Sequence, residues 1–216
     1  MATTTLDGIV EVTSRDRLRE IVGRPNSRAE TKERRKLAET DRQWLAASPF
    51  CLVATSDADG NCDVSHKGDP PGFAHVLDDT TIAIPERPGN KRADGFHNIL
   101  SNPHVGLLFL IPGRGDTLRI NGRARLISDA PFFDDMTVKG HRPKLAVLVD
   151  IDGVYYHCAK SFMRSSLWKP ETWNPTALPR TAEIVKAVQP EIEETVADLD
   201  AHYELFRYSK GLYDTP

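Results

Sequence analysis

The chain has 216 residues, a net charge of −3 at pH 7 and no apolar run longer than residues 105–112. This length is enough for one domain with a sizeable core, the near-neutral charge gives no general attraction to nucleic acid, and the apolar run is far too short to span a bilayer. We therefore expect a globular protein that binds neither nucleic acid nor membrane.

The N-terminus and the cysteines indicate the compartment. The first residues, M-A-T-T-T-L-D, lack the charged-then-apolar pattern of a secretory signal, so we expect a cytoplasmic protein. Cys51, Cys62 and Cys158 are odd in number and lack metal-ligand spacing. That favours reduced thiols and predicts no metal site.

The N-terminal part is polar and helical in pattern. A short helix is predicted over Asp16–Val22, and a single longer helix over Ser27–Ala47 with Ser27 as its N-cap. The longer helix has few apolar residues, namely Leu37, Trp44 and Leu45. Such a polar helix is typical of a surface or of a contact with a partner subunit, not of a core.

From residue 50 onward the chain reads as short strands joined by turns. The predicted strands are Phe50–Thr55, Cys62–His66, Thr80–Ile84, Val105–Ile111, Thr117–Ile127, and a last strand or strand pair at Lys144–Ile151 and Val154–Cys158. Gly122 interrupts the inward apolar series of its strand, as a β-bulge or a close backbone approach would. The strands follow one another like hairpins, and no dinucleotide-binding fingerprint follows a strand. We predict a mainly β (α+β) fold: a small antiparallel barrel of about six strands with peripheral helices.

Further helices are predicted between and after the strands. They cover Ala93–Leu100, Asp129–Met136, part of Ala159–Trp168, Ala182–Val188 and Ile192–Tyr208. Arg119, Arg123 and Arg125 alternate along one strand and share a face. That face is either a solvated barrel exterior or a dimer contact or anion site.

The stretch Pro85–Pro103 carries the most specific chemistry. Asn90 is a good N-cap for the helix predicted after it, which places Lys91 and Arg92 in the first turn. The dipole at a helix N-terminus already favours anions, so two added cations there suit a phosphate group. The alternative is a solvated basic turn before an ordinary helix.

Taken together, the motifs resemble a known family. Their order is S-H-K-G-D at the end of the second strand, then P-G-N-K-R, N-I-L-S-N-P, V-G-L-L-F and T-L-R-I-N-G-R-A. This resembles the pyridoxamine 5′-phosphate oxidase-like split-barrel flavoproteins over roughly Pro49–Trp173, and in particular a bacterial branch of FMN-dependent or flavin-nucleotide-binding proteins. The resemblance implies a six-stranded antiparallel split β-barrel that forms a homodimer, with FMN in a groove between two subunits. We therefore expect the FMN-binding barrel over 49–173, and we predict a helical arm over 1–48 before it and a helical tail over 174–216 that packs on the barrel.

The resemblance also implies which residues bind the cofactor. The FMN phosphate would be held from the second strand and from the loop that opens the helix, by Ser65, His66, Lys67, Asn90, Lys91 and Arg92. Thr117 would contact the flavin ring, and Lys160, Arg164 and Trp168 would close the site. His66 alternatively reads as an ordinary residue at a strand end.

One departure from the family limits the expected activity. Its oxidases carry an R-x-H-x-R cluster after a tryptophan, which grips the substrate phosphate, whereas Trp168 is followed here by K-P-E-T-W-N-P. Oxidation of vitamin B6 is therefore not expected, although FMN binding is unaffected. No catalytic residue is assigned, because the flavin itself carries the redox chemistry. Two classes stay open: an FMN-dependent oxidoreductase acting on a small organic substrate, and a non-catalytic flavin-binding, storage or sensor protein. A haem or F420 binder is a third, weaker option.

Overall fold

The computed structural model describes residues 8–207 and 212–213, without the side chains of 205–207. The chain divides into two compact units, Met1–Glu33 and Arg34–Pro216. The first unit holds the exposed helices α1 (Arg15–Val22) and α2 (Ser27–Thr31). The helix expected at Asp16–Val22 is present, but Ser14 caps it, by accepting a hydrogen bond from the Arg17 backbone N–H at 3.1 Å.

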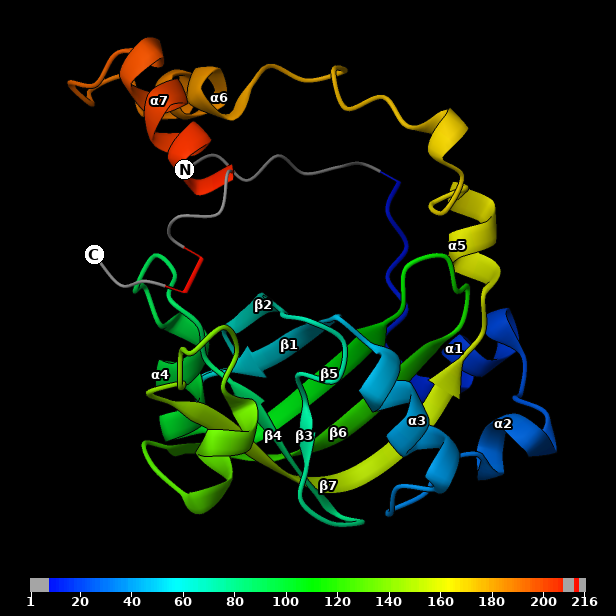
Figure 1. The fold of residues 1–216 in the computed structure, drawn as a ribbon. Helices are drawn as coiled ribbons and strands as arrows, with labels where there is room; N and C mark the ends of the chain where they lie inside the picture. Colours follow the sequence, from blue (N-terminus) through cyan, green and yellow to red (C-terminus); the bar gives the residue numbers. More distant parts are fainter. Residues whose placement is uncertain (1–7, 208–211, 214–216) are drawn as a thin grey trace. The chain divides into compact units, whose positions relative to one another are not determined.

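The second unit is built on one antiparallel sheet of seven strands in the order β2-β1-β5-β6-β7-β4-β3 (Figure 1). The strands are β1 (Phe50–Ser56), β2 (Cys62–Gly68), β3 (His75–Val76), β4 (Thr81–Pro85), β5 (His104–Leu110), β6 (Thr117–Ile127) and β7 (Ala146–His157). The sheet is not closed, because β2 and β3 are its two edges. The predicted split β-barrel is confirmed: all six expected strands are present, and the two-residue β3 is an addition.

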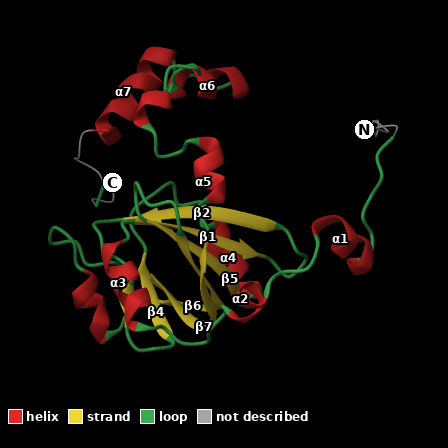
Figure 2. Ribbon diagram, turned by 90° about the vertical axis from the view of Figure 1, so that its right-hand side faces the viewer, coloured by secondary structure: helices red, strands yellow, loops and turns green. Residues whose placement is uncertain are grey.

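Alternate residues of the long strands form the core. The buried apolar side chains on β1, β5 and β6 are Cys51, Val53, Val105, Leu107, Phe109, Leu118, Ile120 and Ala124. Since the side chains of a strand alternate between its two faces, the intervening residues lie on the outer face. The strands curve around this core, as the view in Figure 2 shows.

The bulge expected at Gly122 is confirmed. Asn121 pairs with Gly153 and Gly122 with Ile151, so Asp152 is the extra residue on β7. A Cβ on Gly122 would lie 2.2 Å from the carbonyl oxygen of Asp150, so the two backbones approach too closely for a side chain. The last strand or strand pair expected here is thus one continuous strand, β7.

The single helix predicted over Ser27–Ala47 is wrong. The chain forms α2, capped by Asn26, and then α3 (Glu39–Ala47), with an irregular segment between them. In that segment the backbone of Arg34 pairs with Val154 of β7, and its guanidinium binds Asp41 at 2.5 and 3.0 Å.

The expectation that this region stays out of the core is also wrong. Leu37, Trp44 and Leu45 are buried in the main core cluster. Trp44 and Leu45 lie on α3 and Leu37 lies just before it, so the few apolar residues of the region pack against the barrel from its C-terminal half. A fully buried ion-paired carboxylate, Asp41, lies on the same helix.

The remaining helices are short. They are α4 (Asp94–Ser101), the 3₁₀ segments Pro131–Met136 and Pro170–Thr172, α5 (Lys160–Ser165), α6 (Thr181–Val188) and α7 (Val196–Arg207). The helix expected over Asp129–Met136 is instead 3₁₀, and α7 starts at Val196, not at Ile192. The predicted end of α7, Tyr208, lies outside the described residues. Within the part of the chain that the structure describes, no helix has the length and apolarity needed to cross a membrane.

Candidate functional site

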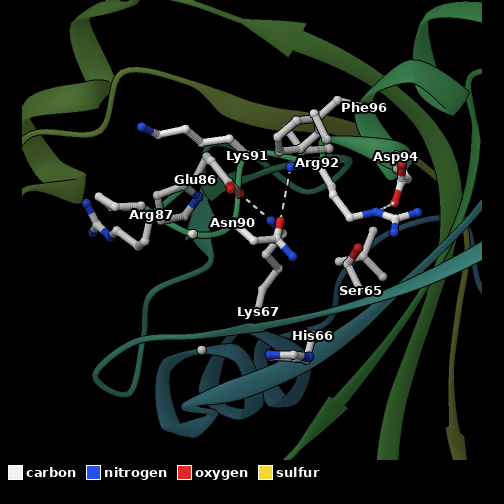
Figure 3. Close-up of a pocket in the computed structure, with 18 of the residues that line it drawn as sticks. Ser65, His66, Lys67, Glu86, Arg87, Asn90, Lys91, Arg92, Asp94 and Phe96 are labelled. Carbon is white, nitrogen blue, oxygen red and sulfur yellow. Dashed lines mark hydrogen bonds and ion pairs between the residues drawn. The ribbon is translucent and has the colours of Figure 1, made fainter. Parts of the chain in front are cut away.

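A cavity of about 640 Å³ lies between the edge strand β2, the segment after β4, and the start of α4. It is lined by residues 63–69 of β2 and its extension, by residues 85–96, and by core residues that include Val53, Phe73 and Ile99. Leu212 and Tyr213 complete the wall. Figure 3 shows the loop of residues 86–92 above β2 with the polar side chains gathered between them.

Helix α4 is held closely against the sheet. Asn98 donates to the hydroxyl of Thr55 at 3.1 Å and to the carboxylate of Asp63 at 2.8 Å. A Cβ on Gly95 would lie 3.4 Å from the Thr55 hydroxyl oxygen and 3.6 Å from that of Ser65. The glycine therefore lets the helix N-terminus approach β2.

Asn90 does not cap α4 as expected. Its side chain accepts a hydrogen bond from the Arg92 backbone N–H at 3.0 Å, and the helix begins after Ala93, at Asp94. Lys91 and Ala93 both have left-handed backbone, with φ of 62° and 61°. Such a conformation costs a non-glycine residue roughly 1–2 kcal/mol and stops the helix from starting earlier.

The first turn of α4 is nevertheless suited to an anion. The first intrahelical bonds come from the N–H groups of Phe96 and His97 to the Ala93 carbonyl, so the N–H groups of Asp94 and Gly95 precede them. Unpaired N–H groups at a helix N-terminus are a common binding site for phosphate. Lys91 and Arg92 lie just before this turn rather than in it, and in Figure 3 their side chains point to opposite sides.

The register of β1 and β2 separates the three β2 residues. Ser65 and Lys67 pair with Val53 and Cys51, whose side chains face the core, so they point toward the cavity. His66 pairs with Leu52 on the opposite face and stacks on Phe50 at a ring distance of 6.3 Å. His66 therefore reaches the cavity only at its rim.

Two ion pairs cross the gap between β2 and β4, which share no strand hydrogen bonds. We call this gap the seam. Lys67 of β2 pairs with Glu86, which follows β4, and Asp69 pairs with Arg87 at 2.6 Å. The polarity is opposite in the two pairs, because β2 supplies the cation in one and its extension supplies the anion in the other.

Each of the three guanidinium nitrogens of Arg87 donates a hydrogen bond to protein. Besides Asp69 it binds the carbonyls of Met136 at 2.7 Å and His141 at 3.2 Å, and its side chain is 13% exposed. The phenol of Tyr213 donates to Asp69 at 2.5 Å, and burial together with this bond raises the pKa of Tyr213 to about 12. Arg87 therefore fixes the loop in place, and its charge is already paired with Asp69.

The other cations of the cavity either lack an ionic partner among the described residues or are paired with a single carboxylate, which a bound anion could replace. Lys67 lies 4.9 Å from the centroid of the Phe96 ring and pairs with Glu86. Arg92 is 75% exposed and binds Asp94 at 2.7 Å. Lys91 has no ionic partner among the described residues.

The structure thus brings together six of the ten residues expected at the site and leaves four elsewhere. Ser65, His66, Lys67, Asn90, Lys91 and Arg92 line the cavity. Thr117 is 2% exposed at the start of β6, opposite His157, and it does not line the cavity; nor do Lys160, Arg164 and Trp168. Trp168 stacks on Phe162, and its indole N–H is buried without an acceptor among the described residues.

Asp69, Glu86 and Arg87 were missed by the sequence reasoning. Their types and places gave a signal, since the stretch P-E-R-P precedes P-G-N-K-R and S-H-K-G-D ends β2. Their pairing, however, depends on which strands end side by side. Among the described residues, no group of three or more potential metal ligands is present.

Comparison with known proteins agrees with this fold. The sequence model of the pyridoxamine 5′-phosphate oxidase family matches residues 37–158. The chain therefore belongs to the pyridoxamine 5′-phosphate oxidase-like split-barrel family. No curated protein matches the sequence.

Several solved structures are similar to part of the chain. One is a putative pyridoxamine 5′-phosphate oxidase from Lactobacillus delbrueckii, with 24% identity, a TM-score of 0.45, and coverage of 58% of this chain and 99% of that one. HupZ from Group A Streptococcus has 19% identity, a TM-score of 0.44, and coverage of 55% and 91%. HutZ, a heme storage protein from Vibrio cholerae, has 12% identity, a TM-score of 0.38, and coverage of 57% and 94%.

Proposed function

We propose that this chain binds FMN non-covalently in the cavity between β2 and α4 and acts as an FMN-dependent oxidoreductase on a small organic substrate. The observation that carries the proposal is the convergence of Ser65 and Lys67 with the loop Asn90–Arg92 at the N-terminus of α4. A terminal phosphate suits this set of hydroxyl, ammonium, guanidinium and backbone N–H donors.

The dimensions of the cavity fit the cofactor. Sites for small molecules and cofactors commonly span about 300–1,000 Å³, and this one is about 640 Å³. Its floor is apolar, with Val53, Phe73 and Ile99, while its polar groups come from β2 and from the loop. A flavin placed with its phosphate at the loop would have this apolar surface along one side only, which leaves the rest of its ring system to be covered by a second copy.

In this arrangement each residue has a binding role. Lys67 and Arg92 would bind the phosphate, Ser65 would donate its hydroxyl, and Asn98 would keep α4 in position through Thr55 and Asp63. FMN, when bound, supplies the electron-transfer chemistry. Arg87 and Asp69 keep the loop in one conformation so that the donors are preorganised.

The cavity suits a flavin better than a haem. Haem iron needs an axial ligand such as histidine. Among the described lining residues the only histidine is His66, and its ring stacks on Phe50 on the outer face. F420 differs from FMN in its longer phosphate-linked tail. A competition experiment between FMN and F420 for the same site therefore shows which of the two cofactors the cavity prefers.

We also propose that the chain is a cytoplasmic homodimer. The outer face of β2, β1 and β5 carries the apolar residues Val64, Leu52, Ala54 and Leu108, and Val64 is 65% exposed. A second copy would cover this face. Because a six-stranded barrel is too narrow to enclose a flavin, the ring system would lie in a groove that the second copy helps to form. The partner would also supply contacts that one chain does not bring to the cavity, from the region of Lys160, Arg164 and Trp168.

The absorption spectrum of the purified protein, followed by titration with FMN, FAD and riboflavin, tests this function. We expect fluorescence quenching with FMN bound most tightly and about one per subunit. Protein that stays colourless and gives no quenching would remove the proposal. Bleaching of bound flavin by a substrate distinguishes an oxidoreductase from a storage or sensor protein.

A further inference from the structure

The cavity contains as many acidic as basic side chains. Its described lining residues include the bases Lys67, Arg87, Lys91 and Arg92 and the acids Asp63, Asp69, Glu86 and Asp94. A site that only attracted phosphate would carry an excess of positive charge. The acids therefore need their own explanation, and Glu86 is the one that pairs with Lys67, the cation that β2 directs into the cavity.

Glu86 is held rigidly and at low exposure. Its backbone N–H donates to the Leu145 carbonyl at 2.8 Å, directly after the pairing of Pro85 with Ala146. Its carboxylate is 27% exposed and pairs with Lys67, which is 18% exposed. The pair is therefore built into the end of a strand and is not formed by two mobile surface side chains.

Lys67 needs a counterion whether or not a ligand is present. Its ammonium lies 4.9 Å from the centroid of the Phe96 ring, and Lys67 pairs across the strands with the buried Cys51, so an unpaired ammonium there would lose most of its hydration. Removing one partner of such a pair leaves an uncompensated charge, which is strongly destabilising. Glu86 neutralises Lys67 when the phosphate is absent.

We propose that Glu86 is a competing anion that sets the affinity of the site: it holds Lys67 in the free protein and yields it to the ligand phosphate. This inference rests on the proposed binding of a phosphate-bearing ligand at the seam. Binding then exchanges one anion for another at Lys67 and leaves a carboxylate beside the phosphate, which lowers the affinity for the phosphate but not for the ring.

The second seam pair does not exchange. Asp69 is 1% exposed and also binds Tyr213, while Arg87 binds two further carbonyls. The two pairs thus have different roles: Asp69–Arg87 keeps the seam closed, and Lys67–Glu86 is the one that a ligand opens.

The test compares wild type, Glu86→Gln, Glu86→Asp and the control Asp150→Asn, each titrated with FMN and riboflavin. Asp150→Asn removes the same charge from an exposed pair with Arg125, outside the cavity. We expect Glu86→Gln to tighten FMN about 10-fold or more, which corresponds to about 1.4 kcal/mol, with riboflavin unchanged. The FMN affinity of Glu86→Asp should lie between those of wild type and Glu86→Gln, and Asp150→Asn should change FMN affinity by less than about 3-fold.

Thermal unfolding supplies the second readout. Without ligand, Glu86→Gln should melt below wild type because Lys67 is unpaired, and FMN should raise its melting temperature by more than it raises that of wild type. If Glu86→Gln is too unstable to titrate, the FMN affinities of Glu86→Asp and wild type are compared, and tighter binding by Glu86→Asp supports the proposal.

The outcomes separate the two proposals. Weaker FMN binding in both Glu86 variants would show that Glu86 positions Lys67 and does not compete, and equal changes for FMN and riboflavin would show that the phosphate is not involved. Either result, or no change at all, overturns this inference while FMN binding by wild type stands. A wild type that binds FMN no better than riboflavin overturns the phosphate site itself.

Discussion

Arg87 donates its Nε to the carboxylate of Asp69 over 2.6 Å, and the Asp69 side chain is only 1% exposed. The pair joins the segment after β4 to the extension of β2, where no strand hydrogen bonds run. Because the same guanidinium also holds two backbone carbonyls, the position of the whole basic loop depends on one side chain.

Arg87→Ala should therefore destabilise the protein strongly. It leaves Asp69 buried without its cation, a change that typically costs about 3–5 kcal/mol. Urea unfolding measures the loss, and Arg125→Ala is the control, since Arg125 pairs with Asp150 on an exposed surface where such pairs contribute about 1 kcal/mol or less. Equal losses in the two variants would contradict a structural role for Arg87.

Arg92→Ala should weaken FMN, and Lys91→Ala should weaken it less, because the two side chains point to opposite sides of the loop. A charge-assisted contact contributes about 1.5–3 kcal/mol, or roughly 10- to 150-fold in affinity. Arg92 must first leave Asp94, so we expect its effect near the lower limit. Riboflavin, which lacks the phosphate, should be almost insensitive. Arg123→Ala, on an exposed position of β6 outside the cavity, is the control; riboflavin affinity that falls as much as FMN affinity would mean that the loop cations are structural.

Stability should fall in acid partly through Asp41. Burial alone would raise the pKa of this carboxyl, but hydrogen bonds from Arg34 and from the Ala38 backbone outweigh it and hold the pKa below its usual value. A depressed pKa in the folded state stabilises the protein above the unfolded pKa of about 3.9, and this stabilisation is lost as pH falls through the folded value.

Asp41→Asn should therefore lower the free energy of unfolding at neutral pH. Below about pH 4, the free energy of unfolding of this variant should depend less on pH than that of wild type. Unfolding by urea at a series of pH values checks this. The control is Asp59→Asn in the exposed turn between β1 and β2, which removes a carboxyl without touching α3. If the free energy of unfolding falls as steeply with decreasing pH in Asp41→Asn as in wild type, Asp41 does not cause the loss of stability in acid.

Two strand glycines should respond differently to alanine. At Gly122 the new Cβ would meet the Asp150 carbonyl oxygen at 2.2 Å and Val149 Cγ1 at 2.8 Å, whereas at Gly106 the nearest atom is 3.6 Å away. Gly122→Ala should lose about 1–3 kcal/mol or more through overpacking, and Gly106→Ala should be nearly neutral. Similar melting temperatures for both variants would show that the bulge can widen at little cost.

Light scattering should give a particle of twice the 24.1 kDa of one chain, even at sub-micromolar concentration. Val64→Glu, on the outer face of β2, should shift the protein toward monomer and lower FMN occupancy, because charge on a buried apolar interface is unfavourable. A 24.1 kDa particle that still carries full FMN would contradict both the dimer and a site that needs two subunits.

The strand pattern was readable from sequence because it is local. Alternation at Leu118, Ile120 and Ala124, broken at Gly122, predicts both the inward face of β6 and its bulge, and both are confirmed. The basic loop was also readable, since Pro and Gly end the strand before it. The predicted N-cap at Asn90 was wrong, because the Asn90 side chain accepts its hydrogen bond from the Arg92 backbone N–H, before the helix begins.

The pairs between residues far apart in the chain could not be predicted from the sequence. Helix propensity over Ser27–Ala47 is overridden by the Arg34 backbone pairing with Val154, which is 120 positions further along the chain (154 − 34). Likewise nothing near Lys67 indicates Glu86 as its partner, since their contact depends on how far the barrel curls. Sequence patterns therefore located the cations of the candidate site but not the acids that pair with them.

The opposite polarity of the two seam pairs also limits how β2 can be placed. Inward and outward residues of β2 alternate with period two, so a two-residue slip would keep every side chain on its own face and is not opposed by the apolar pattern. Such a slip in one direction would bring Asp69 to Glu86, and in the other it would bring Lys67 to Arg87. Like charges would then meet at low exposure, so the charges at the seam select one register for an edge strand that hydrogen bonds hold on one side only.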